Sequence, residues 1–393
     1  MTTYLNSLGL ICALGDDQQS VRQGLVNYTA EYLTQDSAYH VTEHPFFLGK
    51  AQHLPELTDF PDYQKTRNNA LAYAALKQIE GEFRALSKNI AKERIAVIIG
   101  SSTSGIAEGE AAAQCKLDTG EFPDDYDYAC QELYAPAQFV ADYLGITGPT
   151  YTISTACSSS AKALHSASMM LELGLVDLVI CGGVDSLCKL TVSGFDALES
   201  MSQEKCQPFA LHRDGINIGE AAALFVMSTQ TAPIALLGAG ESSDAYHISA
   251  PDPSGAGAIR AMKAAMKAAS CVSEDIGYIN LHGTGTEKND EMESRAVFEI
   301  FADQVPASST KRLTGHTLGA AGALEAALCW LILDSVEMSL PVHELVAVRD
   351  DALAPIRLVS EDSKLKKPTC MSNSFAFGGN NMSLILGRVD AVQ

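Results

Sequence analysis

The chain has 393 residues, of which 47% are hydrophobic and 19% charged, so it is long enough for two domains or one large duplicated core. It contains 27 Lys and Arg against 48 Asp and Glu, a net charge of 27 − 48 = −21. This charge argues against nucleic acid as the main partner. An acidic protein partner would have to dock on a local basic patch.

Ten cysteines are scattered along the chain without the paired spacing of a zinc site or a disulfide framework. We therefore expect reduced thiols, no bound metal and a cytoplasmic location. The chain starts with Met-Thr-Thr-Tyr-Leu-Asn, which lacks the basic and apolar regions of a secretory signal. The longest apolar run, 326–333, is far shorter than the ~20 residues that span a bilayer, so no membrane span is predicted.

The first half opens with a predicted strand over 3–13, a short helix from Asp16 and a polar, Pro-bearing surface excursion over 30–62. Helical periodicity follows from Tyr63 to about Phe83. The acidic, aromatic stretch 118–134 indicates a surface loop. A continuous apolar run is typical of a buried strand in a parallel sheet, and it predicts a strand over 94–99. Further strands are predicted over 150–154, 176–181 and 221–228.

From about residue 233 the order of elements begins again. Strands are predicted at 234–240, 276–281, 356–359, 370–374 and 382–386, and helices at 257–269 and 289–301 and in an apolar stretch ending at Leu333. Each half contains sheet strands and one nearly all-apolar helix behind a glycine-rich turn. The order of elements therefore predicts a duplicated α/β architecture, with halves 1–232 and 233–393 sharing one layered core.

Cys157 lies where a β-branched strand gives way to small residues and an Ala/Ser/Leu/Met-rich helix. We place it in the first turn of that helix, at the carboxyl end of a strand, where α/β sheets bind ligands. Free N–H groups and the helix dipole favour a thiolate there, and a thiolate is a nucleophile. A small core cysteine is the alternative, and this stretch alone does not decide between them.

Three other turns follow predicted strands or precede apolar helices. His282 precedes Gly-Thr-Gly-Thr, and His316 lies in Gly-His-Thr-Leu-Gly-Ala-Ala-Gly. Ser372 to Asn380 contains Phe-Gly-Gly, a sharp turn of the kind that can expose backbone N–H groups to an oxyanion. Each has an ordinary alternative: a turn histidine, a capping or core histidine, and a hairpin loop. Together with Cys157, these turns place one cysteine, two histidines and a glycine-rich turn each at the end of a predicted strand.

Taken in order, these motifs closely resemble the β-ketoacyl–acyl carrier protein synthases, and more narrowly the elongating, decarboxylating type with a Cys-His-His site. The resemblance covers the chain beyond about residue 90 and rests on Thr-Ala-Cys-Ser-Ser (155–159), His-Gly-Thr-Gly-Thr (282–286), Thr-Lys (310–311), Gly-His-Thr-Leu-Gly-Ala-Ala-Gly (315–322) and Asn-Ser-Phe-Ala-Phe-Gly-Gly-Asn-Asn (373–381). It implies a thiolase-like fold, two similar halves in a five-layer α-β-α-β-α core, and usually a dimer.

The resemblance also implies roles. Cys157 would accept the acyl group, and His282 and His316 would act on a malonyl unit. Lys311 and Glu325 would form the charged pair behind the histidines. The backbone N–H groups of Cys157 and Phe377 would form the oxyanion hole, with Phe377 also the gate, and Phe195 and Phe375 would line the acyl pocket. Acyl carrier protein would deliver substrates on phosphopantetheine, with no metal or redox cofactor.

The chain departs from the family pattern at three places. Its first ninety residues are shorter and more polar than expected, Asn380-Asn381 replaces the usual Thr-Asn, and Asp-Ala-Leu-Glu follows Phe195 where a basic residue often stands. The first two changes favour a specialised polyene or polyketide pathway over general fatty-acid elongation, and the third bears on carrier docking. Lys65 and Arg67 are the candidates for carrier docking, with a solvated helix face as the alternative.

Three other functions stay open. A thiolase shares the fold but needs a second active cysteine, and Cys370 lacks the required Cys-x-Gly context. A non-catalytic chain-length subunit would lack the nucleophile, although a heterodimer with such a subunit is compatible with the sequence. A cysteine hydrolase would leave the second histidine and Lys311 without a role.

Overall fold

The computed structural model describes residues 1–27, 30–335, 339–343, 347–360 and 363–389. Within these ranges the main sheet has ten strands in the order β10-β9-β11-β12-β8-β1-β7-β6-β4-β5. Its strands are β1 (Thr3–Cys12), β4 (Ile95–Gly100), β5 (Thr150–Ile153), β6 (Leu178–Asp185), β7 (Ala221–Ser228), β8 (Ile234–Ser243), β9 (Tyr278–Asn280), β10 (Ala307–Ser308), β11 (Thr369–Phe375) and β12 (Asn380–Arg388). A separate hairpin joins β2 (Leu33–Asp36) to β3 (Phe46–Gly49).

The strand order is symmetric about the junction of β1 with β8, which pair antiparallel through Thr3 with Leu236 and Tyr4 with Ala235. Outward from this junction each half has two antiparallel pairings and then two parallel ones. In chain order, β1, β4, β5, β6 and β7 correspond to β8, β9, β10, β11 and β12. The topology therefore supports the expected duplication; the boundary between residues 232 and 233 stays a prediction.

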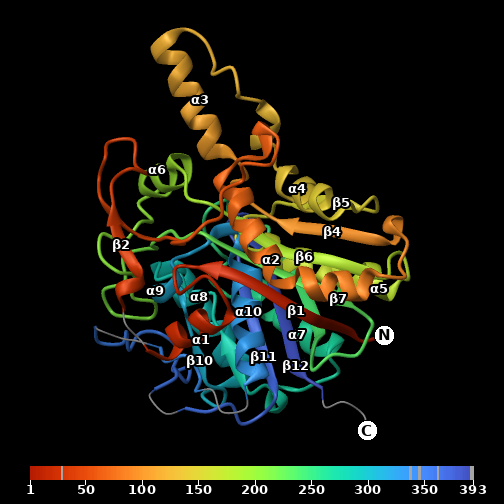
Figure 1. Cartoon of the computed structure of the whole chain (residues 1–393). Coiled ribbons are helices and arrows are strands. Elements are labelled where there is room, and N and C mark those ends of the chain that lie inside the picture. Colours follow the sequence, from red (N-terminus) through yellow and green to blue (C-terminus); the bar gives the residue numbers. More distant parts are fainter. Residues whose placement is uncertain (28–29, 336–338, 344–346, 361–362, 390–393) are drawn as a thin grey trace.

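Helices and sheets alternate in five layers (Figure 1). The central layer contains α5 and α10, which contact each other between the two half-sheets. The outer layers are formed by α2 and α4 on one side and by α7 and α8 on the other. The helices are α1 (Gln18–Asn27), α2 (Arg67–Ser87), α3 (Ile106–Thr119), α4 (Ala135–Leu144), α5 (Ser159–Glu172), α6 (Lys189–Ala197), α7 (Ala256–Ala268), α8 (Glu287–Phe301), α9 (Lys311–Thr314) and α10 (Ala321–Asp334).

Small residues let the central helices lie close to their neighbours. A Cβ on Gly100 of β4 would lie 2.3 Å from the backbone nitrogen of Ser160, and one on Gly322 of α10 would lie 2.7 Å from the Cβ of Ala161. Both distances are shorter than real carbon contacts, so these positions need glycine. The first turn of α5 is thereby held between β4 and the first turn of α10. Helix α10 is apolar and buried nearly all round, as the central layer requires.

Some expected elements differ from the structure. No named strand forms over 356–359, where Leu358 makes a single bridge to Ala307. The helix expected from Tyr63 begins at Arg67, because Thr66 accepts a hydrogen bond from the N–H of Asn69 and caps it. Helices α4 and α6 were not expected. The excursion over 30–62 is only partly a surface segment, since β3 buries Phe46 and Leu48 in its own apolar cluster.

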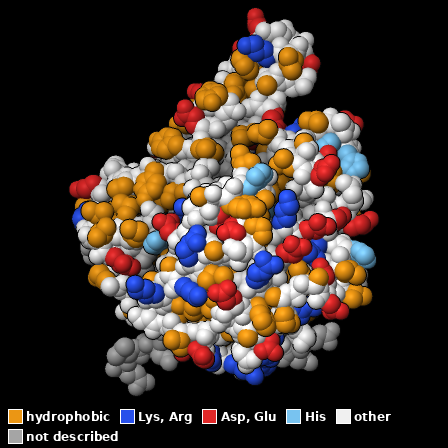
Figure 2. Space-filling view, turned by 180° about the vertical axis from the view of Figure 1, so that it is seen from behind, with side chains coloured by type: hydrophobic (Ala, Val, Ile, Leu, Met, Phe, Trp, Pro, Cys, Tyr) orange, Lys and Arg blue, Asp and Glu red, His pale blue; other side chains and the backbone are white. Residues whose placement is uncertain are grey.

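An arm formed by α3 and the residues after it projects from the layered body (Figure 1). Apolar side chains gather along this arm on the face shown in Figure 2. Leu117 is 80% exposed and Tyr128 is 64% exposed, which is high for large apolar side chains. In the described part of the chain, no helix combines the length and apolar character needed to cross a membrane.

Candidate active site

Cys157 lies between β5 and α5, at the carboxyl end of a parallel strand. Helix α5 begins at Ser159, so Cys157 lies before the first turn of the helix. The sequence had predicted a position within that turn. Ala156, directly before it, has a φ of 53°, an uncommon value for a residue with a side chain. This backbone turn directs the cysteine into the site while the chain enters the helix.

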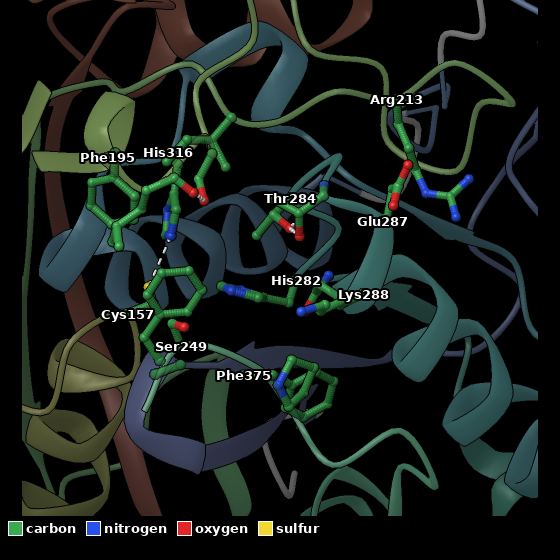
Figure 3. A pocket seen from close by; sticks show the side chains of 18 of the residues that line it. Cys157, Phe195, Arg213, Ser249, His282, Thr284, Glu287, Lys288, His316 and Phe375 are labelled. Atoms are coloured by element: carbon green, nitrogen blue, oxygen red, sulfur yellow. Dashed lines mark hydrogen bonds between the residues drawn. The ribbon is translucent and has the colours of Figure 1, made fainter. Parts of the chain in front are cut away.

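The sulfur of Cys157 meets two imidazoles from the other half of the chain (Figure 3). His316 Nε2 lies 2.9 Å from Cys157 Sγ. The rings of His282 and His316 are 5.3 Å apart at their centres and stand at 84° to each other. One ligand-type atom from each of the three residues falls within 4.8 Å of the others, and all three side chains are buried. The three residues predicted from separate motifs are thus brought together.

The ionisation of Cys157 differs from the sequence expectation. Burial raises the pKa of the thiol to about 11, against lowering effects from the Lys311 charge and from the backbone N–H groups of Phe377 and Cys157. The expectation of a helix-stabilised thiolate was therefore wrong for the resting site. The cost of desolvating a charged sulfur exceeds what the helix start provides. A group that accepts the thiol proton is needed, and His316 is in contact with it.

Both histidines are neutral at physiological pH. Burial, reinforced by the nearby Lys311 charge, holds the pKa of His282 and His316 well below the usual value. The Lys311 ammonium can only donate, so its 3.5 Å contact with His282 Nδ1 makes that nitrogen an acceptor. The ring proton of His282 is then on Nε2. Figure 3 shows the His282 ring directed across the pocket towards Cys157.

Lys311 and Glu325 form a buried ion pair behind the histidines. Lys311 Nζ also donates to the backbone carbonyl of His282. Burial raises the pKa of Glu325 to about 7, and the contact with Lys311 opposes that rise. The pair links α9 to α10 and fixes the orientation of His282. The expected pairing of Lys311 with Glu325 is therefore present in the structure.

The Phe-Gly-Gly turn closes one side of the pocket. The backbone N–H of Phe377 lies close enough to Cys157 to lower the pKa of its thiol. Gly378 and Gly379 have φ values of 81° and 76°, which glycine adopts without strain. Hydrogen bonds hold the turn: the N–H of Gly378 donates to the carbonyl of Ile248 at 2.7 Å, and the N–H of Asp244 donates to the carbonyl of Gly379 at 2.9 Å.

The cavity in front of Cys157 has a volume of about 460 Å³. Phe195 of α6 and Phe377 lie beside each other with ring centres 5.7 Å apart, and Phe375 packs 6.2 Å from the His282 ring. All three line the cavity, together with Asn381 and the exposed Glu287 and Lys288 at the start of α8. Their roles in acyl binding stay a prediction.

Two buried carboxylates that the sequence analysis missed hold the catalytic loops. Glu293 of α8 accepts the backbone N–H groups of His282 and Gly283, both at 2.7 Å. Asp185 accepts the N–H of Ser102 at 2.7 Å and of Gly319 at 2.6 Å, and so ties a loop of one half to the His316 loop of the other. Burial raises the pKa of Glu293 to about 8 and raises that of Asp185.

Lys65 and Arg67 do not form a free basic patch. Arg67 Nε donates to the buried Glu220 at 2.8 Å, and its Nη2 pairs with the same carboxylate. Lys65 pairs with Asp62 at 2.8 Å. The structure thus speaks against Arg67 as a docking residue, because releasing it would leave a buried carboxylate without its cation. Docking by Lys65 stays a prediction.

The cysteine and the two imidazoles have donor types and a spacing that zinc could bridge. The positive charge of Lys311 behind His282 opposes a divalent cation at this point. The arrangement suits a different chemistry: a nucleophile, a proton acceptor and a neutral hydrogen-bond donor around one cavity.

Taken together, a duplicated five-layer core with a cysteine on one half and two histidines on the other defines a thiolase-like acyltransferase. Comparison with known proteins specifies the family. The family profile "Beta-ketoacyl synthase, N-terminal domain" matches residues 67–232, and "Beta-ketoacyl synthase, C-terminal domain" matches residues 234–342. The chain belongs to the β-ketoacyl synthase family.

Individual relatives agree. The chain is 30% identical to 3-oxoacyl-[acyl-carrier-protein] synthase 1 of Haemophilus influenzae, over 98% of both proteins. It is 32% identical to 3-oxoacyl-[acyl-carrier-protein] synthase 2 of Staphylococcus aureus, over 81% of this chain and 80% of the relative. Among solved structures, it resembles a chain from the complex of a ketosynthase (ApeO) with its chain length factor (ApeC) from Xenorhabdus doucetiae. That match has a TM-score of 0.95 and 46% identity, and covers 99% and 98% of the two chains.

Proposed function

We propose that the protein catalyses a decarboxylating Claisen condensation between an acyl group on Cys157 and malonyl–acyl carrier protein, which gives 3-oxoacyl–acyl carrier protein. The observation that carries the proposal is the meeting of Cys157 Sγ with His316 Nε2 at 2.9 Å, beside a second neutral imidazole, in one cavity. A hydrolase needs one histidine, whereas a second, neutral imidazole suits the stabilisation of an enolate.

In the first half-reaction, Cys157 Sγ attacks the carbonyl carbon of an acyl thioester. His316 accepts the thiol proton as the S–C bond forms, because the raised thiol pKa makes a free thiolate rare at neutral pH. The N–H groups of Cys157 and Phe377 donate to the carbonyl oxygen as it becomes negative. The carrier thiolate then leaves and takes up the proton from His316.

In the second half-reaction, neutral His282 donates a hydrogen bond from Nε2 to the thioester oxygen of the malonyl unit, and neutral His316 also donates in the tautomer whose ring proton is on Nε2. The C–C bond to the carboxylate breaks, CO₂ leaves, and the electron pair forms an enolate. Its carbon attacks the acyl carbonyl on Cys157, the C–S bond breaks, and the Cys157 thiolate takes up one proton from solvent, which is the proton that the overall reaction consumes. Decarboxylation supplies the carbanion, so this route uses no stronger base than imidazole and no metal or redox step.

Both substrates would arrive on the phosphopantetheine arm of an acyl carrier protein, as the names of the curated relatives suggest. We also propose a dimer in which the second subunit is a chain-length-factor-like protein. The 46% identical relative comes from such a complex, and the exposed apolar side chains of the α3 arm are suited to burial against a partner. This pairing favours specialised polyene or polyketide synthesis over general fatty-acid elongation.

Intact-mass spectrometry of the protein with acyl-carrier thioester, before and after malonyl-carrier is added, tests the proposal. We expect a stable acyl adduct that Cys157→Ala abolishes, and a 3-oxoacyl product that forms only with malonyl donor. Free acid without malonyl donor would indicate a hydrolase. Product from two acyl thioesters without loss of CO₂ would indicate a thiolase, although Cys370 is fully buried in β11. Native mass spectrometry after co-expression with candidate partners tests the dimer.

A further inference from the structure

A loop near the N-terminus holds helix α6, which carries Phe195. His40 lies before β3 and is buried, and its Nε2 contacts Asp196 Oδ2 at 3.1 Å. The backbone N–H of Val41 donates to Ser193 Oγ at 3.1 Å. Ser193 and Asp196 flank Phe195 on α6, so two consecutive residues of the loop fasten the helix on either side of this aromatic ring.

The hydrogen-bond roles of His40 follow from its neighbours. The N–H of Thr42 donates to His40 Nδ1 at 3.2 Å, so that nitrogen is an acceptor. The proton of the neutral ring is then on Nε2 and is donated to the Asp196 carboxylate. The imidazole also packs on Phe46, with ring centres 5.5 Å apart. The loop is therefore itself anchored to the β3 hairpin.

One apolar cluster connects this clamp to the catalytic pocket. Phe46 of β3, Val192 of α6 and Leu318, two residues after His316, belong to the same buried cluster, against which Phe195 packs. On its other side Phe195 lines the cavity and lies beside Phe377. The position of α6 therefore determines where the Phe195 ring lies, and so how far the cavity extends. The family profile match begins at residue 67, so the clamping loop lies outside the matched region.

We propose that His40 is a positioning residue that holds α6 through Asp196 and thereby sets the length of acyl chain that the pocket accepts. The inference rests on the proposed condensing function. Without the clamp, the start of α6 is still held by the N–H groups of Lys189 and Leu190, which donate to Glu110 of α3. The end of the helix that carries Phe195 loses its side-chain tie, so Phe195 gains freedom to move away from Phe377. Longer acyl groups should then be accepted more readily relative to short ones.

The test compares acylation of Cys157 by short and long acyl-carrier thioesters in His40→Ala and Asp196→Ala. We expect the long-to-short ratio of kcat/KM to rise about fivefold in each variant, the size expected for one partly exposed charged hydrogen bond. The double variant should show no further rise, because both changes remove the same contact. His40→Gln, which offers a donor and an acceptor, should restore most of the original ratio.

His53→Ala is the control for loss of a histidine–aspartate pair at an exposed site, since the His53 side chain is 87% exposed and that of His40 is 7% exposed. His53 also pairs with an aspartate, Asp16 at 2.6 Å, in the same N-terminal region, but it does not touch α6. An unchanged ratio in Asp196→Ala would overturn the inference even if His40→Ala failed to fold, since Asp196 is 40% exposed and tolerates truncation. A ratio that rises equally in His53→Ala would also overturn it. If the unmodified protein does not catalyse condensation, the proposed function is refuted instead.

Discussion

Replacing His282 with alanine should separate the two half-reactions. Acylation uses His316, which contacts Cys157 Sγ at 2.9 Å, and the backbone N–H groups of Cys157 and Phe377. None of these groups is removed. Condensation also needs a donor to the malonyl thioester oxygen, and His282 is the imidazole whose tautomer Lys311 fixes as that donor.

The size of the effect follows from the burial of the site. Loss of one preorganised donor to a developing oxyanion costs about 10²–10³ in rate, or about 2.7–4 kcal/mol. We expect the upper end, because His282 is fully buried and water does not readily replace its N–H. Condensation in His282→Ala should fall about 10³-fold, whereas the rate of Cys157 acylation should stay within about threefold, since no group that it uses is lost.

The two rates are measured separately, acylation by intact mass and condensation by release of labelled CO₂ together with 3-oxoacyl product. His343→Ala is the control for loss of a buried imidazole. Burial lowers the pKa of His343 to about 4, and its partners are the N–H of Ser309 at 3.1 Å and the carbonyl of Pro208 at 3.0 Å, away from the sulfur. Equal losses of acylation and condensation in His282→Ala, with His343→Ala active, would refute this division of roles.

Three further outcomes are expected. Alkylation of Cys157 by iodoacetamide should rise about tenfold per pH unit between pH 7 and 10, since the thiol pKa is about 11 and the thiolate reacts; a rate that is flat over this range would show that the helix start does hold a thiolate. Arg67→Ala should lower the free energy of unfolding by about 2–3 kcal/mol, because it leaves Glu220 without its cation. Lys65→Ala should lower it by less than about 1 kcal/mol. Chemical denaturation measures both values, and equal small losses would contradict the structural role of Arg67. Condensation needs neutral imidazoles, and the pKa values of His282 and His316 lie well below 6.5. The condensation rate should therefore drop on the acid side with a midpoint below pH 6.5. A midpoint at or above pH 6.5 in a pH–rate profile, with the fold intact by circular dichroism, would contradict the lowered pKa values.

The features that sequence predicted well are those that depend on neighbours along the chain. Apolar runs marked β4, β6 and β7, and Cys157 and His282 each follow a predicted strand. Helix α6 escaped prediction because it is short and buries mainly Val192, so its pattern lacks an apolar stripe. The sequence did hold one signal that was overlooked: Asp290 and Glu293 are three residues apart, which places both on one face of a helix. In the structure both side chains are fully buried, which is rare for carboxylates.

Ionisation was the harder property to predict, because it depends on groups distant along the chain. The helix start beside Cys157 is visible locally, but the walls that desolvate the sulfur come from residues more than 100 positions away, such as His316 and Phe377. The same reason explains Arg67. Its partner Glu220 is 153 residues away, so the sequence shows a basic residue at a helix start and not a buried ion pair.

The duplicated topology explains why the catalytic groups meet. Cys157 precedes α5 and His316 precedes α10, and these are the equivalent central helices of the two halves. Their first turns pack together at Ala161 and Gly322, where any larger side chain would separate them. A cysteine before one helix and a histidine before the other are therefore brought together by the symmetry of the fold. The 2.9 Å contact between Sγ and Nε2 depends on that packing as much as on the two residues themselves.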